Sequence, residues 1–232
     1  MRICTIFKLT LILFTAALLG GCVSPPEIKT SAAAPLSVPT GLKSRTLGLG
    51  PVVTRINPDE SSVGVRYSWF GRSASLPRLP PDAALVTRGD MVRVFDGVLA
   101  PLGYQLQKKS SSVFEPSAVP DLVLGGSISK VVADAWHLHA TDPSYRGGLA
   151  DIIKGHATLD ITWEVFDTST GHVIYTSKVV GRFEADGSVP GGVSSLILNA
   201  YVDSLKGLVA EPAFRDAILN SKPAVKDKES AA

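Results

Sequence analysis

Two histidines that could bind a metal stand two residues apart, at the end of an apolar segment. They are His137 and His139. On a strand this spacing places both imidazoles on one face, and Asp142 or His156 could then supply a third ligand. No third ligand stands at a fixed spacing from the pair, and a strand end that runs into a solvated loop explains the same residues. We therefore expect no metal site and no other cofactor.

The serine and carboxylate patterns of hydrolases are incomplete in this sequence. A nucleophilic serine needs a strained turn of the form Gly-x-Ser-x-Gly, and residues 192–196 lack the final glycine. The same residues fit a helix start capped by Ser194 or Ser195 better. Asp160 and Glu164 would share the outer face of one strand, where a carboxylate pair is typical of a solvated surface rather than of a cleft. The sequence thus predicts a protein that is not an enzyme.

The remaining reactive candidate is a cysteine near the amino terminus. Residues 1–21 contain an apolar run, Leu9–Leu19, and end in Gly20-Gly21 directly before Cys22. A run this short is typical of a secretory signal, because a membrane-spanning helix needs about 20 apolar residues. The small residues before Cys22 make the segment resemble a bacterial lipobox, which implies cleavage and acylation at that cysteine. An ordinary signal peptide with a coincidental cysteine is the alternative.

Acylation would fix both the location and the composition of the mature chain. Each buried CH₂ of an acyl chain contributes about 0.8 kcal/mol of membrane affinity. In the lipoprotein families that this segment resembles, an Asp directly after the acylated cysteine usually retains the protein in the inner membrane. This chain has Val23 at that position, so the resemblance implies a location at the periplasmic face of the outer membrane. The full chain has a net charge of +2, and cleavage of the signal removes Arg2 and Lys8, so the mature chain would be neutral. A neutral chain does not suggest a nucleic-acid partner. Cys22 would be the one cysteine left, so no disulfide is expected.

Composition divides the rest of the chain into three parts. Residues 22–43 are rich in Pro, Ser and Ala without an apolar period, which predicts a disordered linker after the lipidated cysteine. Residues 220–232 alternate Lys with Asp, Glu and Ala and predict a disordered tail. Between them, residues 44–219 predict one periplasmic domain.

The spacing of apolar residues predicts the elements of this domain. We expect strands at 46–53, 63–70, 104–107, 121–132, 157–165 and 172–184, and helices from the N-cap Asp82 to Leu99, over 193–208 and from Pro212. Residues 76–81 and 137–155 are predicted as loops, and residues 187–192 should interrupt the sheet. The order strand-helix-strand-strand-hairpin-helix predicts an α+β fold, with a mostly antiparallel sheet and helices packed on one face.

The middle of the chain resembles a known group of small periplasmic lipoprotein domains. The strings that carry the resemblance are residues 120–128, 159–167 and 170–174, followed by an amphipathic helix. The group includes the curli-pore lipoprotein, the outer-membrane activators of penicillin-binding proteins and the amino-terminal domain of the TolB type. The resemblance spans about residues 45–210 by element order and implies docking to other envelope proteins or self-association. The chain departs from the group at residues 55–81 and 137–155, where we would look for a partner site.

Aromatic residues outside the periodic elements are either core residues or interface anchors. Tyr67, Trp69, Phe70 and Trp136 are of this kind. If they are not core residues, they define a docking surface with their polar neighbours. The candidate docking residues are Arg66, Tyr67, Trp69, Phe70, Arg72, Trp136, His137 and His139.

The sequence predicts a non-catalytic, lipid-anchored interaction or scaffold protein. It would dock to or regulate an envelope protein machine, or form a homo-oligomer. One alternative is a lipid-handling accessory of an envelope transporter, in which the apolar sheet face or the region of Trp69 holds an acyl chain. A further alternative is an envelope hydrolase.

Overall fold

The computed structural model describes residues 34–56, 62–67, 73–77, 86–107, 118–137, 153–189 and 191–220. The predicted acylation site Cys22 and the tail beyond residue 220 lie outside the described residues. No helix within these ranges combines the length and the apolar character needed to cross a bilayer.

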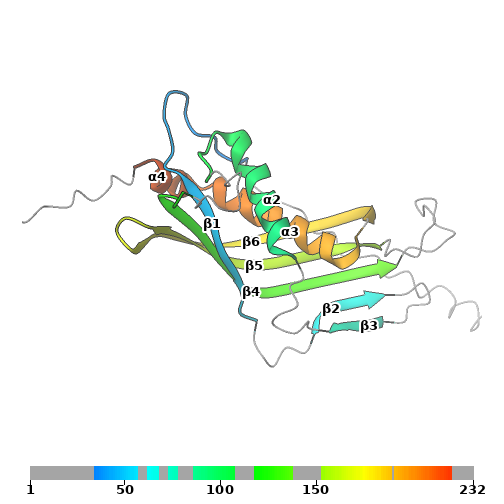
Figure 1. Ribbon diagram of the computed structural model, residues 1–232. Coiled ribbons are helices and arrows are strands. Elements are labelled where there is room, and N and C mark those ends of the chain that lie inside the picture. The colour runs from blue at the N-terminus through cyan, green and yellow to red at the C-terminus, as the bar shows by residue number, and fades with distance from the viewer. Residues whose placement is uncertain are drawn as a thin grey trace, which may run out of the picture.

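A six-stranded sheet forms the base of the domain (Figure 1). Its strands are β1 (Leu47–Thr54), β2 (Ser62–Tyr67), β3 (Ser73–Pro77), β4 (Leu122–His137), β5 (Ile153–Asp167) and β6 (His172–Val189). Their order is β3-β2-β4-β5-β6, and β1 also pairs with β4. Strands β1 and β2 run parallel to β4, whereas the pairs β2–β3, β4–β5 and β5–β6 are antiparallel. The predicted α+β fold with a mostly antiparallel sheet is confirmed.

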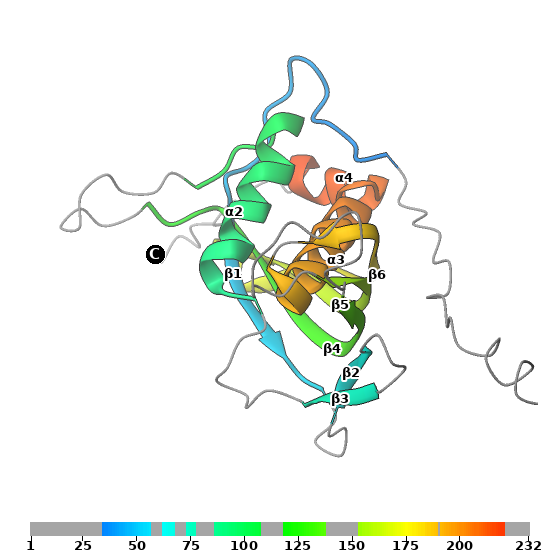
Figure 2. The same cartoon turned by 90° about the vertical axis from the view of Figure 1, so that its right-hand side faces the viewer.

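Three α-helices cover one face of this sheet (Figures 1 and 2). They are α2 (Arg88–Leu99), α3 (Gly192–Val209) and α4 (Pro212–Asn220), and the short 3₁₀ helix η1 (Ala100–Leu102) follows α2. The predicted apolar period of α3 is confirmed, because Ile197, Tyr201 and Leu205 are buried. Phe214 and Ile218 of α4 are buried too.

The packing of α3 on the sheet depends on one tryptophan and one glycine. Trp163 of β5 is fully buried, and its Nε1 donates a hydrogen bond to Ser204 Oγ in α3 at 3.0 Å. At Gly181 of β6, a Cβ atom would lie 2.0 Å from the carbonyl oxygen of Ala200. The α3 backbone therefore lies so close to β6 at this position that any side chain larger than that of glycine would collide with it.

Tyr201 provides a test of the core. Its ring lies 5.6 Å from that of Trp163, and its buried hydroxyl has no hydrogen-bond partner within the described residues. This burial raises the pKa of Tyr201. Because an unpaired buried hydroxyl costs about 1–3 kcal/mol, we expect Tyr201→Phe to raise the free energy of unfolding by up to about 1 kcal/mol in urea denaturation.

Tyr104 is the matched control for this prediction. It is also buried, with a pKa raised to about 12 by burial, but its hydroxyl donates to the carbonyl oxygen of Leu36 at 3.2 Å. Tyr104→Phe should therefore lower the free energy of unfolding by about 1 kcal/mol. A loss of stability for Tyr201→Phe equal to that for Tyr104→Phe would contradict the assignment of an unpaired hydroxyl.

The structure corrects the start of the first helix and the caps of α3. Helix α2 begins at Arg88, and its N-cap is Thr87, whose Oγ1 accepts a hydrogen bond from the Asp90 backbone N–H. Asp82 is therefore not its N-cap, and lies outside the described residues. Helix α3 begins after Gly191, which has a φ of 89° and no side-chain cap. The predicted caps Ser194 and Ser195 therefore lie inside α3, which already begins at Gly192.

Strand boundaries also differ from the prediction. Strand β3 includes Leu76 and Pro77, which we expected in a loop; an edge strand tolerates a proline at its end because that backbone N–H is not needed. The predicted strand 104–107 forms only a single bridge, between Leu47 and Leu106. The loop expected at 137–155 overlaps both neighbours, since β4 ends at His137 and β5 begins at Ile153. Strand β6 likewise continues through Gly187. Backbone pairing extends these strands beyond the point where their side chains alternate.

Part of the segment expected as a linker contacts the domain. The Leu36 N–H donates to the carbonyl oxygen of Val209 at 3.2 Å, and the Val38 N–H donates to that of Leu102 at 2.8 Å. Backbone groups make these contacts, so the apolar pattern could not reveal them. We call residues 34–46 the strap, because they run from the end of α3 to the start of β1.

Candidate docking site

Two of the predicted docking residues form an aromatic pair. Tyr67 in β2 and Trp136 in β4 are opposite each other in the parallel register, and their rings stack at a centroid distance of 4.8 Å with an interplanar angle of 12°. Both side chains are half-buried. They therefore match neither a fully buried core residue nor a fully solvated one.

A buried histidine lies beside this pair. His156 in β5 is 5% exposed, and its ring centroid is 5.9 Å from that of Trp136. Its Nε2 lies 3.3 Å from Oδ2 of Asp134, the residue opposite it in β4. Its Nδ1 has no hydrogen-bond partner among the described residues. The carboxylate thus fixes the orientation of the imidazole against the tryptophan.

Asp134 also attaches β2 to the sheet. Its Oδ1 accepts a hydrogen bond from the Val65 backbone N–H at 2.9 Å. Strand β2 is paired with β4 at two positions, Arg66 with Ala135 and Tyr67 with Trp136. At Val65 the Asp134 carboxylate takes the place of a backbone carbonyl as the hydrogen-bond acceptor. One side chain therefore connects three strands, β2, β4 and β5, close to the aromatic pair in sequence.

The cluster faces away from the helices. Ala133, Ala135 and Ala157 are buried on the helix-covered side, and side chains alternate along a strand. Asp134, Trp136 and His156 therefore lie on the opposite face, and β2 lies beside the arrowhead end of β4 (Figure 1). We call Tyr67, Asp134, Trp136 and His156 the aromatic site.

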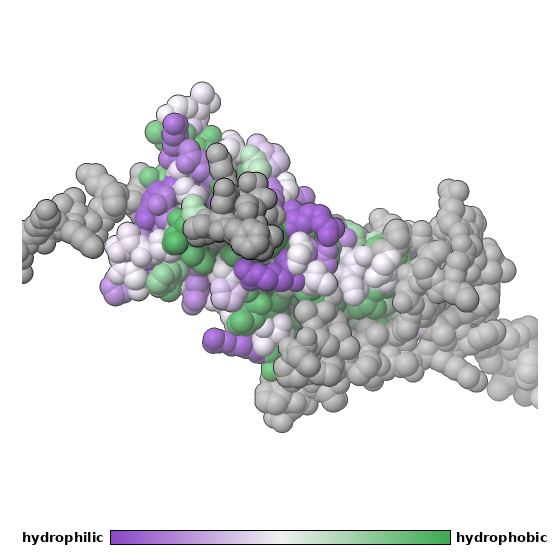
Figure 3. All heavy atoms as spheres, in the orientation of Figure 1, coloured by the Kyte–Doolittle hydropathy of each residue, from purple (hydrophilic) through white to green (hydrophobic). Residues whose placement is uncertain are grey.

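The other predicted docking residues are only partly placed. Arg66 and His137 lie in β2 and β4, each next in sequence to a member of the aromatic pair. Trp69, Phe70, Arg72 and His139 lie outside the described residues. On the described surface that Figure 3 shows, hydrophilic and hydrophobic residues are intermixed.

The residues considered above as candidates for a hydrolase or a metal site do not form a common site among the described residues. Asp160 forms an ion pair with Lys178 at 3.4 Å, and Glu164 is exposed on β5. The third potential metal ligand, His156, is paired with Asp134, and Asp142 lies outside the described residues. In the part of the chain that the structure describes, no three His, Cys, Asp or Glu side chains are grouped to hold a metal.

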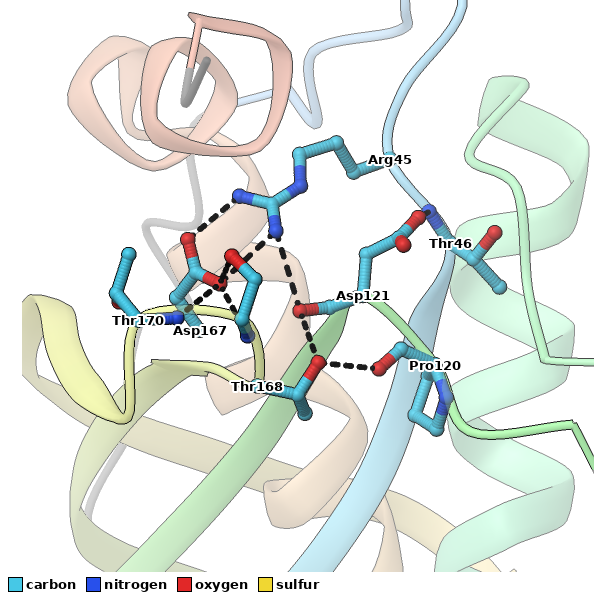
Figure 4. A network of polar contacts seen from close by, with 8 residues as sticks. Arg45, Thr46, Pro120, Asp121, Asp167, Thr168 and Thr170 are labelled. Carbon is cyan, nitrogen blue, oxygen red and sulfur yellow. Dashed lines mark hydrogen bonds and ion pairs between the residues drawn. The ribbon is translucent and has the colours of Figure 1, made fainter. Parts of the chain in front are cut away.

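A second polar cluster lies at the other end of β4 (Figure 4). The Arg45 guanidinium donates to both carboxylate oxygens of Asp167, at 2.8 and 3.0 Å, and to the carbonyl oxygen of Asp121 at 3.3 Å. The Asp121 carboxylate accepts from the Thr46 backbone N–H at 2.9 Å. Thr168 Oγ1 donates to the carbonyl oxygens of Pro120 and Asp121. The cluster connects the strap to the start of β4 and to the β5–β6 turn.

This cluster predicts an acid-sensitive contribution to stability. Asp167 is 1% exposed, and the hydrogen bonds from Arg45 hold the pKa of its carboxyl well below the usual value. A lowered carboxyl pKa stabilises the fold above the unfolded-state pKa of about 3.9, and this stabilisation is lost as the pH falls toward the folded-state pKa. We expect Arg45→Met to cost about 3 kcal/mol at pH 7 in urea denaturation, because it leaves a buried carboxylate without its cation. The loss in free energy of unfolding caused by Arg45→Met should be smaller at pH 3 than at pH 7.

Arg93→Met is the control for Arg45→Met. Arg93 pairs with Asp90 at a similar distance, 2.9 Å, but its side chain is 79% exposed. The change should cost much less than Arg45→Met at either pH, because surface ion pairs are screened by solvent. Equal losses for the two variants would show that burial does not strengthen the Arg45–Asp167 pair.

Comparisons with known proteins give only distant structural likenesses. No protein-family model and no curated protein matches the chain. Among solved structures, it is similar to a Xanthomonas campestris protein of the family DUF330, with a TM-score of 0.36, 12% identity, and 78% of this chain and 93% of that chain covered.

Two further structures show the same level of likeness. For the PelC dodecamer from Paraburkholderia phytofirmans the TM-score is 0.33 at 14% identity, covering 76% of this chain and 94% of that one. For lipoprotein GNA1162 from Neisseria meningitidis the TM-score is 0.28 at 14% identity, and the match covers 69% of this chain and 97% of that chain. At these values we draw no conclusion about function from the likeness and rely on the contacts within the chain.

Proposed function

We propose that this chain is a bacterial envelope lipoprotein, acylated at Cys22, whose domain binds another envelope protein through the aromatic site. The observation that supports this best is the stacked pair of Tyr67 and Trp136 on the sheet face that no described helix covers. Tyrosine and tryptophan are the residues that most often supply binding energy at protein interfaces. The domain would act as a docking or scaffold module without catalysis.

The geometry of the site favours binding because its rings are held in place before a partner arrives. Trp136 is in ring contact with both Tyr67 and His156, and Asp134 contacts both His156 and the β2 backbone. Ordering a side chain on binding costs about 0.5–1.5 kcal/mol, so rings already fixed avoid part of this cost. The buried polar pair thereby supports a largely apolar contact surface.

The lipid would keep this surface close to a membrane. The residues between Cys22 and the start of the strap at Ala34 span at most about 40 Å when fully extended. With Val23 after the acylated cysteine, we place the domain at the periplasmic face of the outer membrane. The partner is then a protein of that membrane, a periplasmic protein or a further copy of this chain.

Photocrosslinking in living cells tests the docking site. With p-benzoylphenylalanine in place of Tyr67, we expect one discrete crosslinked product. Trp136→Ala should reduce its yield at least tenfold, because removal of an aromatic anchor typically costs about 2 kcal/mol or more.

The same photoreactive residue at Thr176, an exposed position of β6, provides the matched control. It should give none of this product. The proposal fails if position 67 gives no product, or if the product forms equally from position 176.

A further inference from the structure

Three apolar side chains adjoin one another on the sheet face opposite the helices. Val123 of β4, Phe166 of β5 and Val173 of β6 are consecutive partners in the strand register. Phe166 stands between the buried residues Val165 and Asp167, so its side chain points away from the helix-covered side. Phe166 is 39% exposed, Val173 is 49% exposed and Val123 is half-buried. We call Val123, Phe166 and Val173 the apolar patch.

The surroundings of Val180 show that the patch does not extend along the whole of β6. Val180 lies on the same face and is similarly exposed, at 38%. Its register partner is Asp160, which forms an ion pair with Lys178. A single apolar residue among charged ones is ordinary on a protein surface, whereas adjoining exposed ones often mark a contact with a protein or a membrane. The apolar patch is therefore confined to the end of the sheet at the β5–β6 turn.

The strap contacts the domain at this same end. Arg45 of the strap bonds Asp167, the residue directly after Phe166 (Figure 4). The β5–β6 turn lies at the opposite end of the sheet from β2 and β3 (Figure 1). The strap thus ends beside the apolar patch and far from the aromatic site.

The start of the strap lies at this end too, beside α4 (Figure 2). The Leu36 N–H donates to the carbonyl oxygen of Val209. Two residues further, the Glu211 carboxylate accepts a hydrogen bond from the Tyr175 hydroxyl of β6. Tyr175 stands two residues after Val173. Any tether that precedes residue 34 therefore enters the domain at the end that carries the apolar patch.

We propose that the apolar patch rests on the lipid surface of the membrane to which the chain is tethered, with Phe166 and Val173 inserted among the lipid headgroups. This inference rests on acylation at Cys22, which is part of the proposed function. It adds a second contact with the membrane, made by the folded domain itself.

The short tether makes a small patch sufficient for this contact. The segment from Cys22 to Ala34 spans at most about 40 Å when fully extended. A short tether keeps its two ends at an effective concentration in the millimolar range. Three side chains bury too little apolar area to hold a free domain on a bilayer, but a tethered domain needs only a weak contact to keep one orientation.

The carboxylates next to the patch do not oppose contact with lipid. Asp167 is buried and paired with Arg45, and the Asp121 carboxylate accepts a hydrogen bond from the Thr46 N–H. Neither has to lose its partners for the patch to meet the headgroups. The contact is therefore apolar and should be insensitive to salt, because screening weakens electrostatic attraction alone.

This orientation would determine where the aromatic site lies. Val123 and Trp136 stand near opposite ends of β4, a strand of 16 residues. At 3.3 Å per residue, the distance between them along the strand is roughly 40 Å. With the apolar patch on the bilayer, the aromatic site would be held at about that height, directed into the periplasm.

Quenching of a fluorophore by lipids tests this inference on the mature acylated protein in vesicles. Because Cys22 is acylated, Val173→Cys introduces the one free thiol, which is labelled with nitrobenzoxadiazole. The vesicles contain phosphatidylethanolamine, phosphatidylglycerol and a nitroxide-labelled phosphatidylcholine. Val180→Cys with the same label is the matched control, about 23 Å further along the same face of β6. We expect at least threefold stronger quenching at position 173, unchanged by high salt.

A second substitution shows whether the patch acts as a unit. In the protein labelled at position 173, Phe166→Ser should reduce the quenching by the nitroxide lipid at least twofold. Val180→Ser is its control and should leave the quenching unchanged. Phe166 and Val180 are similarly exposed, so both variants should fold, which circular dichroism checks.

Three outcomes would overturn the inference. They are equal quenching at positions 173 and 180, unchanged quenching in Phe166→Ser, and a label at 173 that is shielded from both the lipid nitroxide and aqueous iodide. The last result would mean that a protein surface covers the patch. Mass spectrometry separates these failures from that of the anchor: with acylated, vesicle-bound protein only the patch inference fails, whereas a chain that carries no acyl group removes the anchor of the proposed function as well.

Discussion

Gly181→Val is expected to lower the free energy of unfolding by at least about 4 kcal/mol, or to prevent folding. A Cβ at this position would lie 2.0 Å from the Ala200 carbonyl oxygen and 2.7 Å from Ser204 Cβ. These atoms belong to the α3 backbone and to a side chain already bonded to Trp163, so neither can move without loss of buried contacts. Urea denaturation followed by circular dichroism measures the change.

Gly187→Val is the matched control, because it places the same side chain on the same strand. At Gly187 no atom of the described residues lies within 4 Å of an added Cβ, and the residue is exposed. Valine also suits a strand better than glycine does, so the change should stay within about 1 kcal/mol of the original chain. Equal effects of the two substitutions would show that α3 does not lie against β6 as described.

Cys22→Ser is expected to abolish acylation and to release the protein from membranes. No other cysteine follows residue 22, and stable anchoring needs acyl chains whose affinity is about 0.8 kcal/mol per buried CH₂. Metabolic labelling with an alkyne analogue of palmitate should label the original chain and leave the variant unlabelled. Fractionation should show at least a tenfold fall in the membrane-bound share.

Cys4→Ser is the control for acylation, since Cys4 lies in the predicted signal segment. This variant should keep both the label and its place in the membrane fraction. Labelling of Cys22→Ser, or membrane sedimentation unchanged from the original chain, would contradict the predicted lipid anchor.

Local patterns predicted the parts of the fold that depend on neighbouring residues. The alternation from Ala157 to Val165 identified β5 because one side of that strand is buried against the helices. Local patterns also predicted the apolar period of α3 and the polar turn after Asp167. They did not predict that the strap contacts the domain, because its backbone bonds to Val209 and Leu102 leave no periodic pattern in the sequence.

The aromatic site was predicted as single residues but not as an arrangement. Tyr67 and Trp136 meet because β2 runs parallel to β4 in a register that no local pattern determines. Asp134 was missed, although a lone carboxylate between Ala133 and Ala135 in an apolar strand is a usable signal of a paired polar group.

Arg45 could not have been found in this way. Its partner Asp167 is 122 positions away in the sequence, and only the tertiary fold brings the two together.

The strap also determines how the domain would respond to mechanical load. Tension from a lipid at the amino terminus would reach the Leu36–Val209 and Val38–Leu102 bonds first and the Arg45–Asp167 pair next. All three lie on the strap, whereas Tyr67 and Trp136 lie at the far end of β4, a strand of 16 residues. A pull on the tether would therefore strain the amino-terminal end of the domain while the far end kept its shape.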